Sequence, residues 1–260
     1  MENNFSETND AIQGSPLLHF GGKMLNIQHL TKTYGEKKAV DDLSLHIAPG
    51  EIYGFIGHNG AGKTTTLKSV VGILRFDSGS ITIDGTSIQD DPIACKSKIA
   101  YIPDNPDLYE FMTGLKYLNF IADIFKVSKE DREARITKYA DVFELSNDLS
   151  QPIASYSHGM KQKLAIIAAW IHNPKLIIMD EPFVGLDPKA SHLLKGMMRE
   201  VCDNGGAIFF STHVLEVAEK LCDKVAIIKA GKLIRSGTME EVKGDASLED
   251  VFLELEEENN

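Results

Sequence analysis

One short glycine-rich segment constrains the fold of this chain more than any other feature. It follows the apolar run 52–56 and precedes a helical pattern that continues to Val71. The segment consists of Gly57, His58, Asn59, Gly60, Ala61, Gly62, Lys63 and Thr64, and Thr65 follows it. It fits G-x-x-x-x-G-K-[ST], a strand–loop–helix motif in which backbone N–H groups and a helix N-terminus hold phosphate oxygens. The sequence therefore predicts a nucleoside triphosphate site in an α/β fold.

Two side chains at the end of this segment have specific expected roles. Lys63 would reach the β- and γ-phosphates, and the hydroxyl of Thr64 would bind Mg²⁺. The strand before the loop and the helix after it are the context that the motif requires.

Two kinds of apolar run predict two kinds of sheet. Nearly continuous apolar runs cover 52–56, 176–179, 207–210 and 225–228, as expected for strands buried on both faces of a sheet. Weaker alternating runs cover 24–30, 43–47 and 81–83, and they favour an antiparallel sheet with one face in water. We expect a mixed α/β architecture in which both sheets share one chain.

The middle of the chain has a helical pattern. From Thr113 to Phe143 the apolar residues recur at helical spacing, and no strand-like run interrupts them. We expect a helical subdomain over 105–156, inserted into an α/β core formed by 24–104 and 157–260. Residues 1–23 are expected to be a flexible N-terminal extension. One or two amphipathic helical turns are expected from Leu248 onward.

Composition excludes some classes of function. The net charge of −11 argues against a nucleic-acid partner, because such surfaces bind phosphates through Lys and Arg. Cys95, Cys202 and Cys222 are far apart and predict buried, reduced cytosolic thiols. No apolar stretch of about 18 residues is present, so no membrane span is expected.

Two adjacent carboxylates follow the apolar run 176–179. Asp180 and Glu181 would lie at the carboxyl end of a strand, where open α/β sheets bind ligands. Asp180 is expected to hold Mg²⁺ through water. Glu181 would point differently, and would orient or deprotonate an attacking water.

Three further segments complete a resemblance to the ATP-binding cassette (ABC) family that covers nearly all of 24–256. They are Tyr156-Ser157-His158-Gly159-Met160, Gly185-Leu186-Asp187 and Ser211-Thr212-His213. The first resembles the family signature, usually Leu-Ser-Gly-Gly-Gln, and keeps its serine and second glycine. The resemblance implies a P-loop NTPase core of ABC type, RecA-like, with an antiparallel β subdomain and a helical subdomain.

The resemblance also implies residue roles. Ser157, His158 and Gly159 would face the γ-phosphate of ATP held by a second subunit, and Asp187 would lie in the D-loop that crosses the dimer interface. His213 would be the switch histidine at the γ-phosphate, and Tyr34 would stack on adenine. His158 replaces a glycine and Met160 a glutamine, and both changes should alter nearby packing.

One position departs from the family pattern. After the strand 99–102 the family normally has a glutamine that touches Mg²⁺ and the catalytic water, whereas this chain has Pro103 and Asp104. An aspartate is shorter and anionic, so it can bind Mg²⁺ through water but cannot donate a hydrogen bond. We expect Asp104 in the catalytic and metal site with altered geometry.

The resemblance implies partners as well. We expect ATP hydrolysis with Mg²⁺ in a head-to-tail dimer, and integral membrane permease subunits that dock near Asn105–Met112, where aromatic residues and a methionine look exposed. The spelling of the motifs favours bacterial exporters of peptides, antibiotics or lipid-like cargo, peripheral on the inner face of the cell membrane. The open alternative is a non-transport ABC ATPase, acting as a soluble assembly factor or an envelope-associated mechanical coupler.

Overall fold

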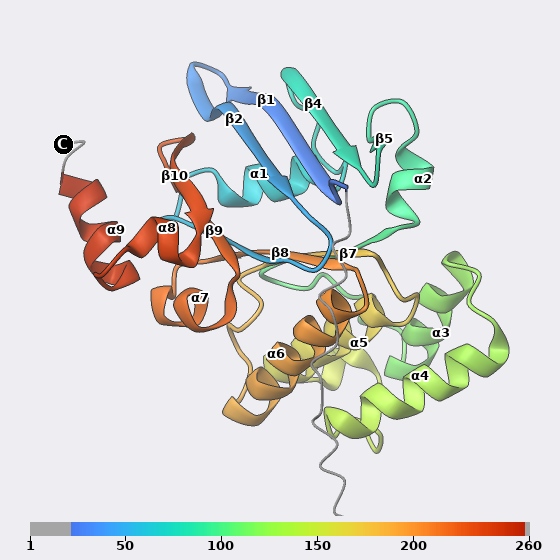
Figure 1. Ribbon diagram of the computed structural model, residues 1–260. Coiled ribbons are helices and arrows are strands. Elements are labelled where there is room, and N and C mark those ends of the chain that lie inside the picture. The colour runs from blue at the N-terminus through green and yellow to red at the C-terminus, as the bar shows by residue number, and fades with distance from the viewer. Residues whose placement is uncertain (1–21, 258–260) are drawn as a thin grey trace, which may run out of the picture.

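The protein is built on a six-stranded, mostly parallel sheet. The computed structural model describes residues 22–257, and Figure 1 shows this sheet across the middle of the molecule. Its strands, in spatial order, are β10 (Lys232–Thr238), β9 (Lys224–Lys229), β3 (Ile52–Ile56), β8 (Ala207–Thr212), β7 (Leu176–Asp180) and β6 (Ile99–Ile102). Only β10 pairs antiparallel, with β9. The predicted runs of continuous apolar residues are therefore the buried strands of one sheet.

Alternate residues of these strands enter two different cores. On β7, Ile177 and Met179 join the core on one face, whereas Leu176 and Ile178 join the core on the other. Side chains of a strand point to opposite faces in turn, so a strand covered on both faces has no polar side. This is why these segments read as unbroken apolar runs.

The second sheet is antiparallel, as the alternating runs predict. It contains β2 (Lys37–Ile47), β1 (Leu25–Tyr34), β4 (Ser78–Ile83) and β5 (Thr86–Ser87), in that spatial order. Buried and exposed residues alternate along the end of β2. Helix α1 (Lys63–Val70) lies between this sheet and the parallel sheet, and Leu67 and Val70 are fully buried there (Figure 1). The short helix α2 (Pro92–Lys96) follows β5.

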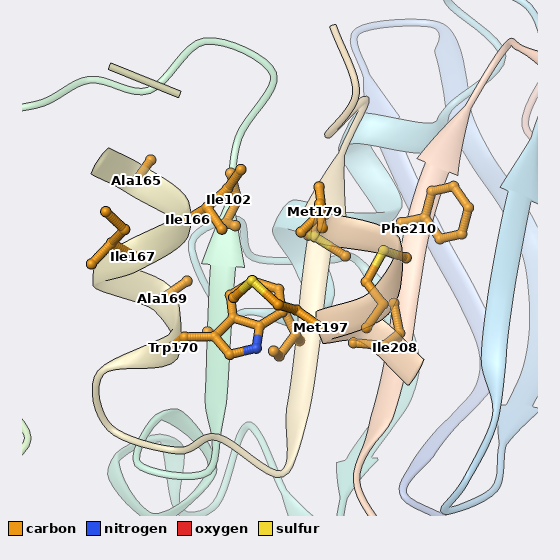
Figure 2. Packing of buried hydrophobic residues seen from close by; sticks show 14 of the residues in the cluster. Ile102, Ala165, Ile166, Ile167, Ala169, Trp170, Met179, Met197, Ile208 and Phe210 are labelled. Atoms are coloured by element: carbon orange, nitrogen blue, oxygen red, sulfur yellow. The ribbon is translucent and has the colours of Figure 1, made fainter. Parts of the chain in front are cut away.

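Helices cover the opposite face of the parallel sheet. They are α5 (His158–Trp170) and α6 (Pro188–Asp203). Figure 2 shows Ile166 and Trp170 of α5 beside Ile102 of β6 and Met179 of β7, with Met197 of α6 nearby. This core fixes the start of α5 relative to the carboxyl end of β7.

Within 105–156 the named elements are all helical. They are α3 (Gly114–Ile124), α4 (Lys129–Val142) and the 3₁₀ turn η1 (Ile153–Ser155). Side-chain caps start both long helices, Thr113 for α3 and Ser128 for α4. That this region and the sheets form separate subdomains with the expected boundaries stays a prediction.

The last three helices in the described part of the chain lie at the end of the parallel sheet away from α3 and α4 (Figure 1). They are α7 (Leu215–Leu221), α8 (Met239–Lys243) and α9 (Leu248–Glu257). The expected C-terminal amphipathic helix is present, with Leu248, Val251 and Phe252 buried. All three cysteines are free and buried. No helix within 22–257 is long and apolar enough to span a membrane, and the predicted extension 1–23 falls outside the described residues except for Gly22 and Lys23.

Candidate nucleotide site

The glycine-rich loop joins the carboxyl end of β3 to the start of α1. Backbone crowding explains two of its glycines. A Cβ on Gly57 would lie 2.5 Å from the carbonyl oxygen of Ile228, and one on Gly62 would lie 2.3 Å from that of Ala39. Gly62 also has a φ of +112°, a conformation that L side chains rarely adopt. No side chain caps α1, so its first N–H groups are left for a ligand.

Lys63 lies buried at the head of α1. Its side chain is 6% exposed, and its ammonium donates hydrogen bonds to the carbonyl oxygens of Gly57 and His58. Its Nζ also lies 3.6 Å from Oε1 of Glu181. A buried ammonium needs such partners, because desolvation penalises an unpaired charge. The structure thus places Lys63 between the phosphate loop and the carboxylate that the sequence predicts to be catalytic.

Asp180 is held by two hydroxyl groups. Thr64 Oγ1 donates to Asp180 Oδ2 at 2.6 Å, and the hydroxyl of Ser211 donates to Asp180 Oδ1. The Asp180 residue is 1% exposed, and it pairs with Ser211 in the β7–β8 register. Carboxylate and hydroxyl oxygens are ligands that Mg²⁺ prefers. Thr64 and Asp180 therefore fit the predicted metal site, which phosphate oxygens and water would complete.

Glu181 lies one residue beyond the strand and turns away from Asp180. Its φ of +48° is in the left-handed region, which is uncommon for a residue with a side chain. Its Oε1 lies 3.0 Å from Nδ1 of His213, and its backbone N–H donates to Ser211 Oγ at 3.1 Å. The Glu181 side chain is 14% exposed and that of His213 is 51% exposed. The structure therefore brings Lys63, Glu181 and His213 together, with His213 open to solvent.

A cavity of about 260 Å³ adjoins the phosphate loop. Tyr34, at the end of β1, lines it together with Lys37 and Thr65. The Tyr34 residue is 51% exposed, and Nζ of Lys32 lies 5.4 Å from its ring centroid. An exposed aromatic ring beside a phosphate-binding loop suits base stacking, and its contact with adenine stays a prediction.

The signature residues lie on a different element from the phosphate loop. Ser157 is the N-cap of α5, where its hydroxyl accepts a hydrogen bond from the N–H of Met160 at 3.2 Å. Asp187 is the N-cap of α6 and forms an ion pair with Lys163 at 2.8 Å. The hydrogen bond from Lys163, and then that from the Ala190 N–H, lowers the pKa of Asp187. That Ser157 and Asp187 act toward the ATP of a second subunit stays a prediction.

Asp104 is exposed at the end of β6. Its carboxylate accepts a hydrogen bond from the N–H of Asn105 at 2.9 Å. Its place in the metal site stays a prediction.

Sequence reasoning missed two residues near this edge. Ser211 was expected only as part of a motif, whereas its hydroxyl contacts both Asp180 and Glu181. The sequence predicts no role for Tyr101, and its buried hydroxyl lacks a hydrogen-bond partner among the described residues. Burial, and then the carboxylates of Asp180 and Asp104, raise the pKa of Tyr101 well above its usual value. Its position three residues before Asp104 is the signal that the sequence offered.

Known proteins are similar to this chain in sequence and in fold. The family model for ABC transporters matches residues 40–184. The ABC-type transporter ATP-binding protein EcsA of Bacillus subtilis is 36% identical over 91% of this chain and 98% of its own length. The chain belongs to the ABC transporter ATP-binding family. It is thus an ABC ATPase, as the sequence predicts.

Other relatives of this ABC ATPase extend the comparison. The Nod factor export ATP-binding protein I of Burkholderia thailandensis is 33% identical over 82% of this chain and 70% of its own length. A solved ATP-binding subunit of an ABC transporter superposes with a TM-score of 0.86 at 36% identity, covering 90% of this chain and 99% of that one. A dimeric ATP-binding cassette, MJ0796, bound to ADP and phosphate, superposes with a TM-score of 0.75 at 25% identity, covering 83% of this chain and 99% of that one. The predicted fold class is confirmed.

Proposed function

We propose that this ABC ATPase pairs head to tail with a second nucleotide-binding subunit around two ATP molecules and drives a separate membrane permease in export. The observation that carries the proposal is the convergence of Lys63, Glu181 and His213 beside the Thr64–Asp180 pair. The dimeric MJ0796 cassette supports the pairing, and the name of the Burkholderia relative supports export.

The chain's own residues divide the chemistry between them. Lys63 binds the β- and γ-phosphates, and Glu181 orients the attacking water and accepts its proton. His213, at the exposed side of Glu181, contacts the γ-phosphate as hydrolysis proceeds. Thr64 and Asp180 would hold Mg²⁺, which would neutralise charge on the phosphate oxygens. Ser157 and Gly159 act on the ATP of the partner subunit, so an isolated subunit should be nearly inactive.

The test is the Glu181→Gln variant. We expect its ATP hydrolysis to fall about 100-fold or more, since the general base is lost, while ATP binding remains. Sedimentation velocity with Mg²⁺-ATP should show a dimer, and the same protein without ATP should be a monomer. Glu216→Gln, at a carboxylate 76% exposed on α7, is the matched control and should hydrolyse ATP normally. A Glu181→Gln protein that stays monomeric with ATP would rule out the proposed pairing.

A groove beside the helical region supports a permease partner. It has a volume of about 430 Å³, and its apolar lining includes Leu108, Tyr117 and Phe125. Tyr109, whose ring centroid lies 6.2 Å from that of Tyr117, and Phe111 are 48% and 82% exposed, and their own ring centroids lie 5.8 Å apart. The expectation of an exposed methionine here is wrong, because Met112 is half-buried against the core. Exposed aromatic residues of this kind are enriched at protein interfaces.

Copurification tests the permease. We expect the full chain, expressed in its own cell, to copurify with an integral membrane protein, as a subunit bound peripherally at the inner face of the membrane would. Phe111→Ser should reduce that recovery severalfold, whereas Leu253→Ser, at an exposed apolar side chain of α9, should not. A stable complex with soluble proteins alone would favour the assembly factor or mechanical coupler instead.

A further inference from the structure

The imidazole of His158 lies against the backbone of Gly185. A Cβ built on Gly185 would lie 2.5 Å from Cδ2 and 2.8 Å from Nε2 of His158. Gly185 has a φ of +82°, and its carbonyl oxygen lies 3.0 Å from the place of a Cβ on Gly159. The first turn of α5 therefore packs directly on the segment 182–187. A glycine at position 158 would have no side chain to make this contact.

Two polar contacts join the same helix to the two ends of that segment. The Nε2 of Gln162, a fully buried residue, donates to the carbonyl oxygen of Pro182 at 3.4 Å. Nζ of Lys163 lies 2.8 Å from Oδ2 of Asp187. Asp187 in turn caps α6 through the N–H of Ala190 at 2.8 Å. The start of α5 thus contacts the segment at its beginning, near its middle and at its end.

This segment leads directly to the catalytic carboxylate. Pro182 follows Glu181, whose carboxylate faces Lys63 and His213. A displacement of the α5 N-terminus therefore reaches Glu181 through a short, packed path. Both His158 and Gly185 are exposed, so a ligand brought by a second subunit can approach them.

We propose that His158 is a positioning residue that locks the signature segment to Gly185, so that this segment and Glu181 of one subunit move as a unit. The inference rests on the proposed head-to-tail dimer, in which the signature faces the partner's ATP while Glu181 acts on the subunit's own ATP. Contact of the signature with one ATP then changes the position of the carboxylate at the other. His158 makes the two ATP sites interdependent.

The first test is His158→Ala in the full chain. Fluorescent ATP titration at low protein concentration should give an unchanged dissociation constant, because the subunit's own phosphate loop is intact. The Hill coefficient of ATP hydrolysis should fall toward 1. In the Glu181→Gln background, the ATP concentration for half-maximal dimerisation should rise roughly fivefold. His158→Gln, whose planar amide can still cover Gly185, should restore part of both losses, and His192→Ala, at an exposed histidine of α6, should change neither.

A double-mutant cycle separates packing from direct contact with ATP. Gly185→Ala introduces backbone strain and a clash with the imidazole, and His158→Ala removes only the clash. We expect Gly185→Ala to impair dimerisation at least about threefold less when His158 is already alanine. Strictly additive effects would overturn the proposal, because His158 would then act on ATP alone. An unchanged Hill coefficient in His158→Ala would also overturn it. If the Glu181→Gln parent does not dimerise with ATP, the proposed dimer itself is wrong and the coupling falls with it.

Discussion

The sequence assigns two regions to ATP. They differ in whether one chain alone supplies the groups that a bound phosphate needs. At the carboxyl edge of the parallel sheet, Lys63, Asp180 and Ser211 are buried. Lys63 donates to the carbonyl oxygen of Gly57, and the Ser211 hydroxyl donates to Asp180. At the start of α5, Ser157 and His158 are exposed, and their contacts belong to their own helix and to Gly185. The first region has the donors and acceptors that a phosphate group needs. Under the proposed function, the second acts on phosphate only when another subunit brings one.

The largest expected effect is at the carboxyl edge of the parallel sheet. Lys63→Ala removes a buried ammonium and leaves Glu181 without that cation, so ATP affinity should fall about 100-fold or more. Fluorescent ATP titration measures the loss. Lys129→Ala, at a side chain 85% exposed on α4, is the control and should bind ATP normally. Tight ATP binding by Lys63→Ala would show that the phosphates lie elsewhere.

The next largest effect should distinguish the role of the signature region from that of the phosphate loop. Ser157→Ala should leave the affinity of the subunit for its own ATP unchanged but lower hydrolysis about tenfold, because a hydrogen bond to the partner's charged phosphate is lost. The change also removes a helix cap, worth about 1 kcal/mol. Ser128→Ala removes the equivalent cap of α4 and is the matched control for that loss. Equal hydrolysis rates in the two variants would make Ser157 an ordinary N-cap.

A third effect concerns stability rather than catalysis. Ser211→Ala leaves the buried Oδ1 of Asp180 without one donor, so the free energy of unfolding should fall by about 1–3 kcal/mol. Urea denaturation measures this change. Ser155→Ala removes an exposed hydroxyl bonded to the carbonyl of Pro152, and it should cost much less. Similar costs for the two variants would mean that the Ser211–Asp180 hydrogen bond contributes little.

The sequence predicts the parallel sheet and the glycine-rich loop well because both depend on local patterns. An apolar run such as 207–210 must be covered on both faces, and this requirement is visible in the run itself. Ser211 was missed because its partner depends on how two strands are aligned. The register of β8 against β7 puts Ser211 beside Asp180. Strands β5 and β10 were missed as well, because neither has a strong apolar pattern.

The signature region shows more clearly which contacts the sequence does not predict. From the sequence, His158 stands out only as a departure from glycine, with packing expected to change around it. Its neighbour Gly185 is distant in sequence, and only the packing of α5 on the sheet brings the two together. The same holds for Gln162 and the carbonyl oxygen of Pro182. Contacts between elements need the relative placement of those elements, which no local pattern encodes.

The smallest expected effect is at Asp104, which shares one property with each of the two regions. It is exposed like the signature residues, yet its charge acts on Tyr101 together with that of buried Asp180. An exposed carboxylate is screened by water, so Asp104→Ala should raise the Mg²⁺ concentration for half-maximal hydrolysis only about threefold. Asp107→Ala, at an exposed aspartate of the same loop, is the control. If Asp104→Ala leaves both ATP hydrolysis and its Mg²⁺ dependence unchanged, Asp104 lies outside the metal site.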